Sequence, residues 1–310
     1  MFEKVLKLVY VAVAIATVIG CGGSGGGGGS NDPRRIYIAD GNDRIVRVNN
    51  MSGSGWTSFG SSGSGVGQFN FLADIAFDSL GRIYCVDYSN NRIVRIDDMT
   101  GAGWTTFGTA GSGVGQFDNP YRIAIDSTDR LYIIDSGNYR VVRIDNMTGA
   151  NWVAFGAQGS GVGQFDGIQG IGLDSIGRIY ITDYINDRIA RIDTMAGAGW
   201  TTFGTSGSGV GQFDGAADIV FNNLGQMLVA DRGGQIVQTD IMSTAGWITL
   251  PLDTVQSATY DSGGRIYAVN QNDNKLSRYD NIGGGGAVTF GTTGSGVNQF
   301  DSPSSVRLGP

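Results

Sequence analysis

Short apolar stretches, each bounded by polar turn residues, recur along this chain with nearly the same letters. The stretch Arg-Ile-Tyr-x-x-Asp occupies 35–40, 82–87, 130–135 (with Leu for Ile) and 178–183, and altered forms occupy 226–231 and 265–270. The successive starts lie 47, 48, 48, 48 and 39 residues apart. A period in the forties, rich in glycine, tyrosine and β-branched residues, predicts a radial or solenoid repeat.

One repeat, 70–108, predicts four strands, at 73–78, 82–87, 92–97 and 104–107, and a crossover to the next unit begins at 108. Short polar turns join them, so the unit is an antiparallel meander. The second strand is apolar almost throughout instead of alternating. This indicates a sheet covered on both faces, as a propeller blade is between its neighbours.

The repeat resembles the NHL repeat of β-propellers. The shared pattern is Gly-x-Gly-Gln-Phe-x-x-Pro, then Ile-Ala-x-Asp-x-x-Gly-Arg-Ile-Tyr-x-x-Asp and Asn-x-Arg-Ile, most complete in 113–145. The resemblance covers about 34–310. It departs in the fifth unit, where Arg-Gly-Gly-Gln stands at 232–235, and in the sixth, which ends in Lys-Leu at 275–276.

The two ends of the repeat region complete one another. The C-terminal part supplies a crossover and a first strand at 304–308, whereas the N-terminal unit begins at a second strand, 35–40. We therefore expect an all-β, six-bladed propeller of four-stranded antiparallel blades, in which the C-terminal strand closes the N-terminal blade. This arrangement removes exposed sheet edges at the junction.

The composition excludes several kinds of chemistry. The chain has no histidine, no glutamate after Glu3, two cysteines and a net charge of −7. The missing histidine removes Ser-His-Asp and Cys-His nucleophiles and His-ligated zinc, and the acidity disfavours nucleic acid. We predict no catalytic residue, no metal and no cofactor. Cys85 lies within a strand pattern and is expected to be a buried apolar residue.

The N-terminus has the pattern of an export signal followed by an anchor. Two lysines precede the apolar run 8–19, and Cys21 follows Val-Ile-Gly, which resembles a bacterial lipobox. We expect a signal peptide at 1–20, a lipidated Cys21 with a glycine-rich tether at 21–31, and the propeller at 32–310. A stray cysteine behind an ordinary signal is the alternative. The resemblance implies a cell-envelope lipoprotein, at the outer membrane or cell surface.

Two repeated motifs favour scaffold roles. Gly-Ser-Gly-Val-Gly-Gln-Phe recurs at 63–69, 111–117, 159–165 and 207–213, with a variant at 294–300. No helix pattern follows it, so we expect a crossover with its Phe packed between blades rather than a phosphate loop. The recurring Asp of Tyr-x-x-Asp is expected to cap its turn or to pair with an arginine such as Arg92.

Sites for a ligand should lie where the repeats differ. Aligned on the crossover Phe, the inner strands vary at two adjacent positions, which gives a candidate ligand mouth of Asp74, Tyr121, Arg122, Gln169, Asp218 and Gln256. Asp74 and Asp218 are three blades apart and hence opposed across the ring. The crossover between the fifth and sixth units is shortened, which predicts a notch in the rim beside Asp218, Gln256 and Ser257.

Three classes of function remain open. A monomeric, membrane-anchored, non-enzymatic module that binds a protein, peptide or glycan fits best. The alternative is a propeller enzyme: a calcium-dependent lactonase-like hydrolase or a lyase, although the related-looking lyases use histidine and the lactonases a Glu/Asn/Asp cluster. RNA binding, as in animal NHL proteins, needs a basic face and disagrees with the acidity.

Overall fold

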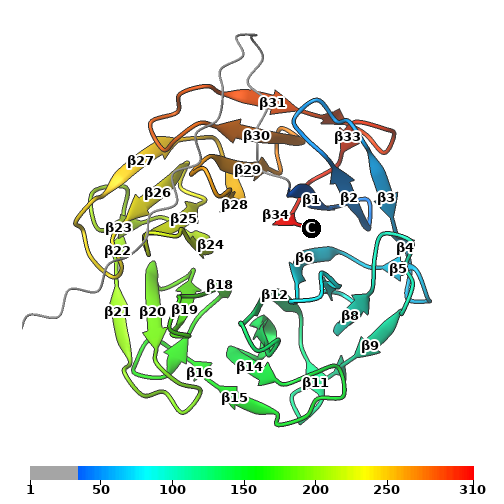
Figure 1. The fold of residues 1–310 in the computed structure, drawn as a ribbon. Coiled ribbons are helices and arrows are strands. Elements are labelled where there is room, and N and C mark those ends of the chain that lie inside the picture. Colours follow the sequence, from blue (N-terminus) through cyan, green and yellow to red (C-terminus); the bar gives the residue numbers. More distant parts are fainter. Residues whose placement is uncertain (1–33) are drawn as a thin grey trace, which may run out of the picture. The chain divides into compact units, whose positions relative to one another are not determined.

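The computed structural model describes residues 34–310, which form a ring of six four-stranded antiparallel sheets (Figure 1). Within this range the helical structure is the single 3-10 turn η1 (Ser136–Asn138). No helix in the described range is long and apolar enough to span a membrane. The predicted signal peptide, Cys21 and tether lie outside the described residues.

Each blade is numbered here from the seam. Blade 1 consists of β34 (Ser305–Gly309), β1 (Arg35–Asp40), β2 (Arg44–Val48) and β3 (Thr57–Phe59). Blade 2 consists of β6 (Leu72–Phe77), β7 (Ile83–Asp87), β8 (Arg92–Ile96) and β9 (Thr105–Phe107). Blade 3 consists of β12 (Pro120–Ile125), β13 (Leu131–Asp135), β14 (Arg140–Ile144) and β15 (Val153–Phe155).

The other three blades repeat this order. Blade 4 consists of β18 (Ile168–Leu173), β19 (Ile179–Asp183), β20 (Arg188–Ile192) and β21 (Thr201–Phe203). Blade 5 consists of β24 (Ala216–Phe221), β25 (Met227–Asp231), β26 (Gln235–Thr239) and β27 (Ile248–Pro251). Blade 6 consists of β28 (Val255–Tyr260), β29 (Ile266–Asn270), β30 (Lys275–Tyr279) and β31 (Val288–Phe290).

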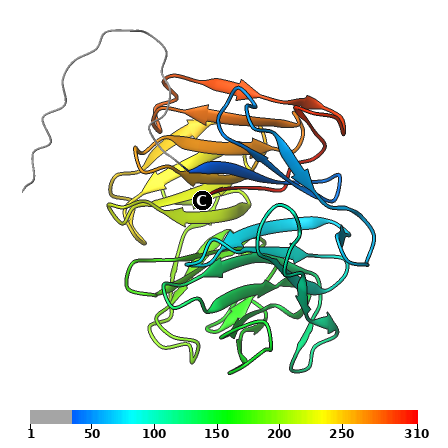
Figure 2. The same ribbon diagram turned by 45° about the vertical axis from the view of Figure 1, so that its right-hand side comes forward.

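The seam confirms the predicted closure. β34 pairs antiparallel with β1, with Ile38 opposite Val306 and Ala39 opposite Ser305. Figure 2 shows the red C-terminal strand beside the blue N-terminal one. Because the inner strand of blade 1 comes from the far end of the chain, the ring has no open sheet edge at this junction.

The second strands are buried on both faces, as their apolar pattern predicts. All five residues of β7 are buried, and the same holds for β13, β19 and β25. The predicted strand bounds are off by a residue at several ends: the inner strand expected at 73–78 is Leu72–Phe77, and the outer strand expected at 104–107 begins at Thr105.

The crossovers contain short strands that the sequence did not predict. Five of them carry a two-residue parallel ladder: β4 (Ser61–Ser62) with β5 (Gln68–Phe69), β10 (Thr109–Ala110) with β11 (Gln116–Phe117), β16 (Ala157–Gln158) with β17 (Gln164–Phe165), β22 (Thr205–Ser206) with β23 (Gln212–Phe213), and β32 (Thr292–Thr293) with β33 (Gln299–Phe300). Each ladder ends in a Phe that has no exposed surface, as expected of a side chain packed between blades. The crossover from blade 5 to blade 6 has no ladder.

Candidate functional site

The recurring Asp of Tyr-x-x-Asp has the structural role that the repeat predicts. In blade 2, Asp87 accepts hydrogen bonds from Arg92 Nε (2.7 Å), the Asn90 side chain (2.9 Å) and the backbone N–H of Asn70 (2.8 Å). Arg140 with Asp135 and Arg188 with Asp183 repeat the ion pair at 2.7 and 2.8 Å. These carboxylates therefore hold the turn and the crossover of their own blade.

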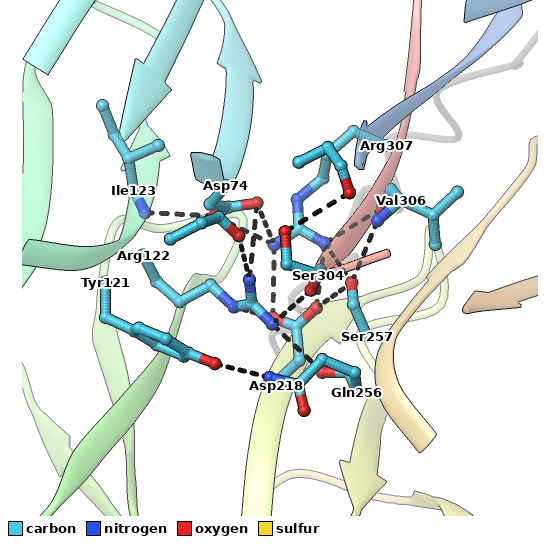
Figure 3. Close-up of polar contacts among 12 residues, drawn as sticks. Asp74, Tyr121, Arg122, Ile123, Asp218, Gln256, Ser257, Ser304, Val306 and Arg307 are labelled. Carbon is cyan, nitrogen blue, oxygen red and sulfur yellow. Dashed lines mark hydrogen bonds and ion pairs between the residues drawn. The ribbon is translucent and has the colours of Figure 1, made fainter. Parts of the chain in front are cut away.

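The middle of the ring holds a cluster of four charged side chains that come from different blades (Figure 3). Asp74 lies on β6, Arg122 on β12, Asp218 on β24 and Arg307 on β34. Asp74 and Arg122 have no exposed surface, and Asp218 keeps 1%. The varied inner-strand positions thus meet one another at the axis instead of lining an open mouth.

Arg307 bridges the two opposed carboxylates. Its Nη1 lies 2.9 Å from Asp218 Oδ2, and its Nη2 lies 3.1 Å from Asp74 Oδ1. Ser257 completes this side: its hydroxyl donates to Asp218 Oδ2 at 2.6 Å and accepts from Arg307 Nη1 at 2.9 Å. One guanidinium therefore links blade 1 to blades 2 and 5.

Arg122 reaches across the ring mainly to backbone oxygens. It donates to the carbonyls of Ala73 (2.8 Å), Gln256 (3.0 Å) and Ser304 (3.1 Å). Its Nε lies 3.8 Å from Asp218 Oδ1, and its Nη1 lies 4.0 Å from Asp74 Oδ1. Three carbonyls thus accept hydrogen bonds from the Nη1 and Nη2 groups of this fully buried guanidinium, and its Nε faces Asp218 without a hydrogen bond.

The cluster has two positive and two negative charges and is therefore neutral overall. Burial disfavours the ionised form of Asp218, but Arg307 and Arg122 outweigh that effect and hold its pKa below the usual value. Burial likewise disfavours charged Arg307, while Asp218 and Asp74 raise its pKa. Both shifts favour the charged forms, so Asp218 and Arg307 remain ionised and paired at neutral pH. A bound cation would have to displace the arginines, since they already neutralise both carboxylates.

A second polar layer adjoins the ion cluster. Tyr121 Oη accepts hydrogen bonds from Gln256 Nε2 at 2.6 Å and from Arg232 Nη2 at 3.2 Å, and Arg232 Nε donates to Gln256 Oε1 at 2.8 Å. Gln169, the remaining predicted mouth residue, is partly buried, and no donor among the described residues contacts its Oε1. The structure therefore brings five of the six predicted mouth residues into one hydrogen-bonded or ion-paired region.

The inner strand of blade 4 has glycine where its neighbours have charged residues. A Cβ on Gly170 would lie 2.9 Å from Asp218 Cα and 2.8 Å from Thr182 Oγ1. Asp218 can therefore approach the axis only because position 170 lacks a side chain. The glycine is part of the cluster although it contributes no chemistry.

Two cavities are relevant to ligand binding. One of about 320 Å³ lies on one side of the ion cluster and is lined by Arg307 and by apolar inner-strand residues such as Ile123, Ile171 and Phe221. The larger, about 590 Å³, lies between blades 5 and 6 and is lined by residues that include Leu252, Lys275 and Tyr279. The predicted notch is thus at the expected crossover, but its lining does not include Asp218, Gln256 or Ser257.

The comparisons with known proteins agree on the fold. No family model and no curated protein matches the chain. A chain in the crystal structure of a nidogen/laminin complex is similar with a TM-score of 0.71 and 18% identity, over 89% of this chain and 98% of that one. Virginiamycin B lyase from Staphylococcus aureus is similar with a TM-score of 0.56 and 16% identity, over 80% and 78%.

A third structure, a Bacteroides caccae protein of unknown function, is similar with a TM-score of 0.63 and 14% identity, over 89% of this chain and 98% of that one. At these identities the likeness establishes the shared propeller fold alone. The chain is a six-bladed β-propeller.

The propeller's remaining reactive groups are few. Burial raises the pKa of the Cys85 thiol well above its usual value, which keeps this fully buried side chain protonated and unreactive. Across residues 34–310 no three His, Cys, Asp or Glu side chains are grouped as metal ligands would be.

Proposed function

We propose that this protein is a non-enzymatic binding module, an NHL-type propeller that presents its surface to a protein, peptide or glycan partner. The observation that carries the proposal is the ion cluster at the axis. In this cluster Asp74, Asp218, Arg122 and Arg307 neutralise one another and join the inner strands of several blades. Side chains that serve this purpose are not free to act as acid, base or metal ligand.

The fold comparisons support the binding role in two ways. One similar structure comes from a complex of two proteins, nidogen and laminin. Another is a virginiamycin B lyase with Quinupristin. That enzyme is a variant with alanine in place of a histidine, and it is catalytically inactive. Our chain contains no histidine, so chemistry of that kind has no counterpart here.

The location follows from the N-terminal sequence. We propose that residues 1–20 direct export, that Cys21 is acylated, and that the glycine-rich segment 21–31 connects the lipid to a monomeric head at the outer membrane or cell surface of a bacterium. Acyl chains insert with about 0.8 kcal/mol per methylene, and two or more chains anchor a protein stably. The net charge of −7 disfavours nucleic acid as a partner.

Cross-linking in the intact envelope tests the binding role. The full chain carries an affinity tag, cells are treated with a short amine-reactive cross-linker, and the products are identified by mass spectrometry. We expect one defined partner that is captured in proportion to the bait. Lys275 is the one lysine after Lys7, so a lysine cross-link from the ring identifies a partner that lies beside Lys275.

The enzyme alternative gives a different outcome in a parallel assay. The purified protein is incubated with lactones in calcium. Turnover that disappears in Asp218→Asn, with the melting temperature preserved, would replace the binding role by a hydrolase. A protein that captures no partner and shows no turnover would contradict the proposal as stated.

A further inference from the structure

The cavity between blades 5 and 6 lies where the other blades hold a crossover loop. Five crossovers have the parallel ladder and a fully buried Phe, whereas Leu252 to Thr254 join β27 directly to β28. The cavity of about 590 Å³ at this place is lined by Leu252, Val255, Ala268, Lys275, Ser277 and Tyr279, among others. The molecule therefore contains five filled versions of this slot and one that is open.

The filled slots show how a loop is held. In blade 2, Phe69 packs in one cluster with Cys85, Val94 and Ile96, and its ring centroid lies 5.5 Å from that of Trp104. The rest of the loop is bound through its backbone. Arg92 donates to the carbonyls of Ser64 (2.8 Å) and Gln68 (3.0 Å), and Asn90 donates to that of Gly63 (2.9 Å). Recognition thus needs one aromatic side chain and several free carbonyls.

Strand register identifies the same slot in blade 6. Asp87 pairs with Arg92 in blade 2 as Asn270 pairs with Lys275 in blade 6. The positions of Cys85 and Val94 are therefore those of Ala268 and Ser277, and the position of Ile96 is that of Tyr279. All three counterparts, Ala268, Ser277 and Tyr279, line the cavity.

The groups that fill the slot in other blades are smaller here. Leu252 precedes β28 by the same three residues as Phe69 precedes β6, and it is only partly buried. Ala287 precedes β31 as Trp104 precedes β9. Pro251 stands where Gly108, with φ of 114°, lets the backbone approach the Phe117 ring. The smaller side chains in place of a Phe and a Trp account for the open volume, and Pro251 in place of the glycine removes the close backbone approach that the other crossovers use.

The polar side of the slot keeps a donor. Lys275 takes the place of Arg92, is exposed, and forms no ion pair with any residue that the structure describes. Its ammonium has three donors and no acceptor. It can therefore serve backbone carbonyls of an entering segment as the arginines serve those of the loops.

We infer that this cavity, named here the blade 5–6 slot, binds an extended, glycine-rich peptide segment of a partner protein that inserts one phenylalanine or tryptophan side chain. The aromatic ring lies against Ala268, Ser277 and Tyr279, and Lys275 donates to the peptide's carbonyls. This assignment rests on the proposed binding function and names its partner class. The five loops of the same chain are the template for the ligand.

A peptide copied from one of these loops is the probe. The octapeptide Gly-Ser-Gly-Val-Gly-Gln-Phe-Asp reproduces 207–214, and its control has Ala for Phe. The full-length protein is treated with an acetylating reagent at millimolar peptide, and the modification rate of Lys275 is followed by mass spectrometry. We expect the Phe peptide to slow acetylation of Lys275, and the Ala peptide to require about tenfold or more higher concentration for the same protection.

Variants of the protein separate the slot from other surfaces. Leu252→Phe restores the side chain found in the other five blades, so we expect an unchanged or higher melting temperature and loss of protection by the Phe peptide. Leu224→Phe is the matched control, because Leu224 is 85% exposed in a turn that does not line the cavity. This variant should bind the peptide like the parent.

Three results would overturn the inference. The first is equal protection of Lys275 by the Phe and Ala peptides, and the second is undiminished protection of Lys275 by the Phe peptide in Leu252→Phe. The third is self-association of the protein that Leu252→Phe abolishes, which would assign the slot to a second copy. The proposed function is judged separately. If the partner cross-linked in cells is captured equally by Leu252→Phe, the module binds elsewhere and the inference fails alone. If the peptide binds as expected but no partner is cross-linked in cells, the peptide-binding assignment of the slot is supported and the proposed function is contradicted.

Discussion

Arg307, on β34 of blade 1, lies 2.9 Å from Asp218 on blade 5, two blades away around the ring, and 3.1 Å from Asp74 on the adjacent blade 2. Its blade is built from both ends of the chain, so this guanidinium adds a second connection to the seam that β34 and β1 form by backbone pairing. Closure of the propeller therefore depends on side-chain charge at the axis as well as on the ladder.

Replacing Arg307 by Met should destabilise the ring strongly. The change leaves two carboxylates in the interior with only Arg122 beside them, and breaking a buried pair in this way costs about 3–5 kcal/mol. Urea unfolding measures the loss. Arg278→Met is the control, since its partner Asp280 is 52% exposed, and such a pair contributes about 1 kcal/mol or less. Equal losses in the two variants would show that the axial cluster does not stabilise closure.

The crossover Phe should contribute more to stability than its counterpart at the blade 5–6 slot. Phe117 is fully buried and packs against Trp152, so Phe117→Ala should cost about 3–5 kcal/mol. Leu252 is partly exposed beside a cavity, so Leu252→Ala should cost less than about 2 kcal/mol. The free energy of unfolding in urea compares the two. A larger loss in Leu252→Ala would mean that this leucine, like the Phe, closes its blade.

The axial cluster illustrates how far the sequence could predict the site. Five residues after the crossover Phe, where blade 2 has Asp74, blade 1 has Ser305. The side chain of blade 1 that reaches the axis is instead Arg307, two residues farther along the same face. The sequence does mark Arg307 as unusual. At the position of Arg307 the other blades have Ala76, Ala124, Gly172, Val220 and Thr259. An arginine among small and apolar residues marks an exception. Its partners could not be inferred, because contacts across a ring depend on side-chain reach and not on local pattern.

The repeated features were predictable for the opposite reason. The Asp–Arg pairs, the buried Phe and the split seam blade each follow from spacing that recurs, so one reading applies to several blades. The parallel ladders in the crossovers were missed because two-residue strands leave no hydrophobic period. The open slot could be located from the nine missing residues in the last repeat spacing, but its distance from the axial residues required the structure.

Asp126 should make stability depend on pH in the acid range. Burial opposes its ionisation, but hydrogen bonds from Thr128 and Arg130 prevail and lower its pKa from 3.8 to about 2. A lowered carboxyl pKa contributes stability that is present above the unfolded value and is lost as pH falls through the folded one. Asp126→Asn should therefore flatten the decline of melting temperature between pH 3.8 and about 2.

Thr128→Val is the companion variant for this test. It removes one hydrogen bond to Asp126 and should move the acid transition to higher pH without abolishing it. Melting curves at closely spaced pH values, recorded for both variants and the parent, measure the effect. An unchanged acid decline in Asp126→Asn would assign the pH dependence to other carboxylates.

Exchange of Cys21 for Ser tests the predicted anchor. A serine cannot accept the thioether-linked lipid, so the variant should move from the detergent phase to the aqueous phase on phase partitioning. Cys85→Ser is the control, because Cys85 is buried within blade 2 and should leave partitioning unchanged. Retention of Cys21→Ser in the detergent phase would contradict the lipobox interpretation.

Calcium should have little effect on the stability of the propeller. A tight calcium site needs six to eight oxygen ligands, and Asp74 and Asp218 already bind Arg307 at 3.1 and 2.9 Å. A cation entering between them would have to expel that guanidinium into a cavity lined largely by apolar side chains. The measurement is the melting temperature in calcium and in chelator. A ligand at about 100 times its dissociation constant adds about 2.7 kcal/mol, so a shift of that size, lost in Asp218→Asn, would restore the calcium-dependent lactonase-like alternative.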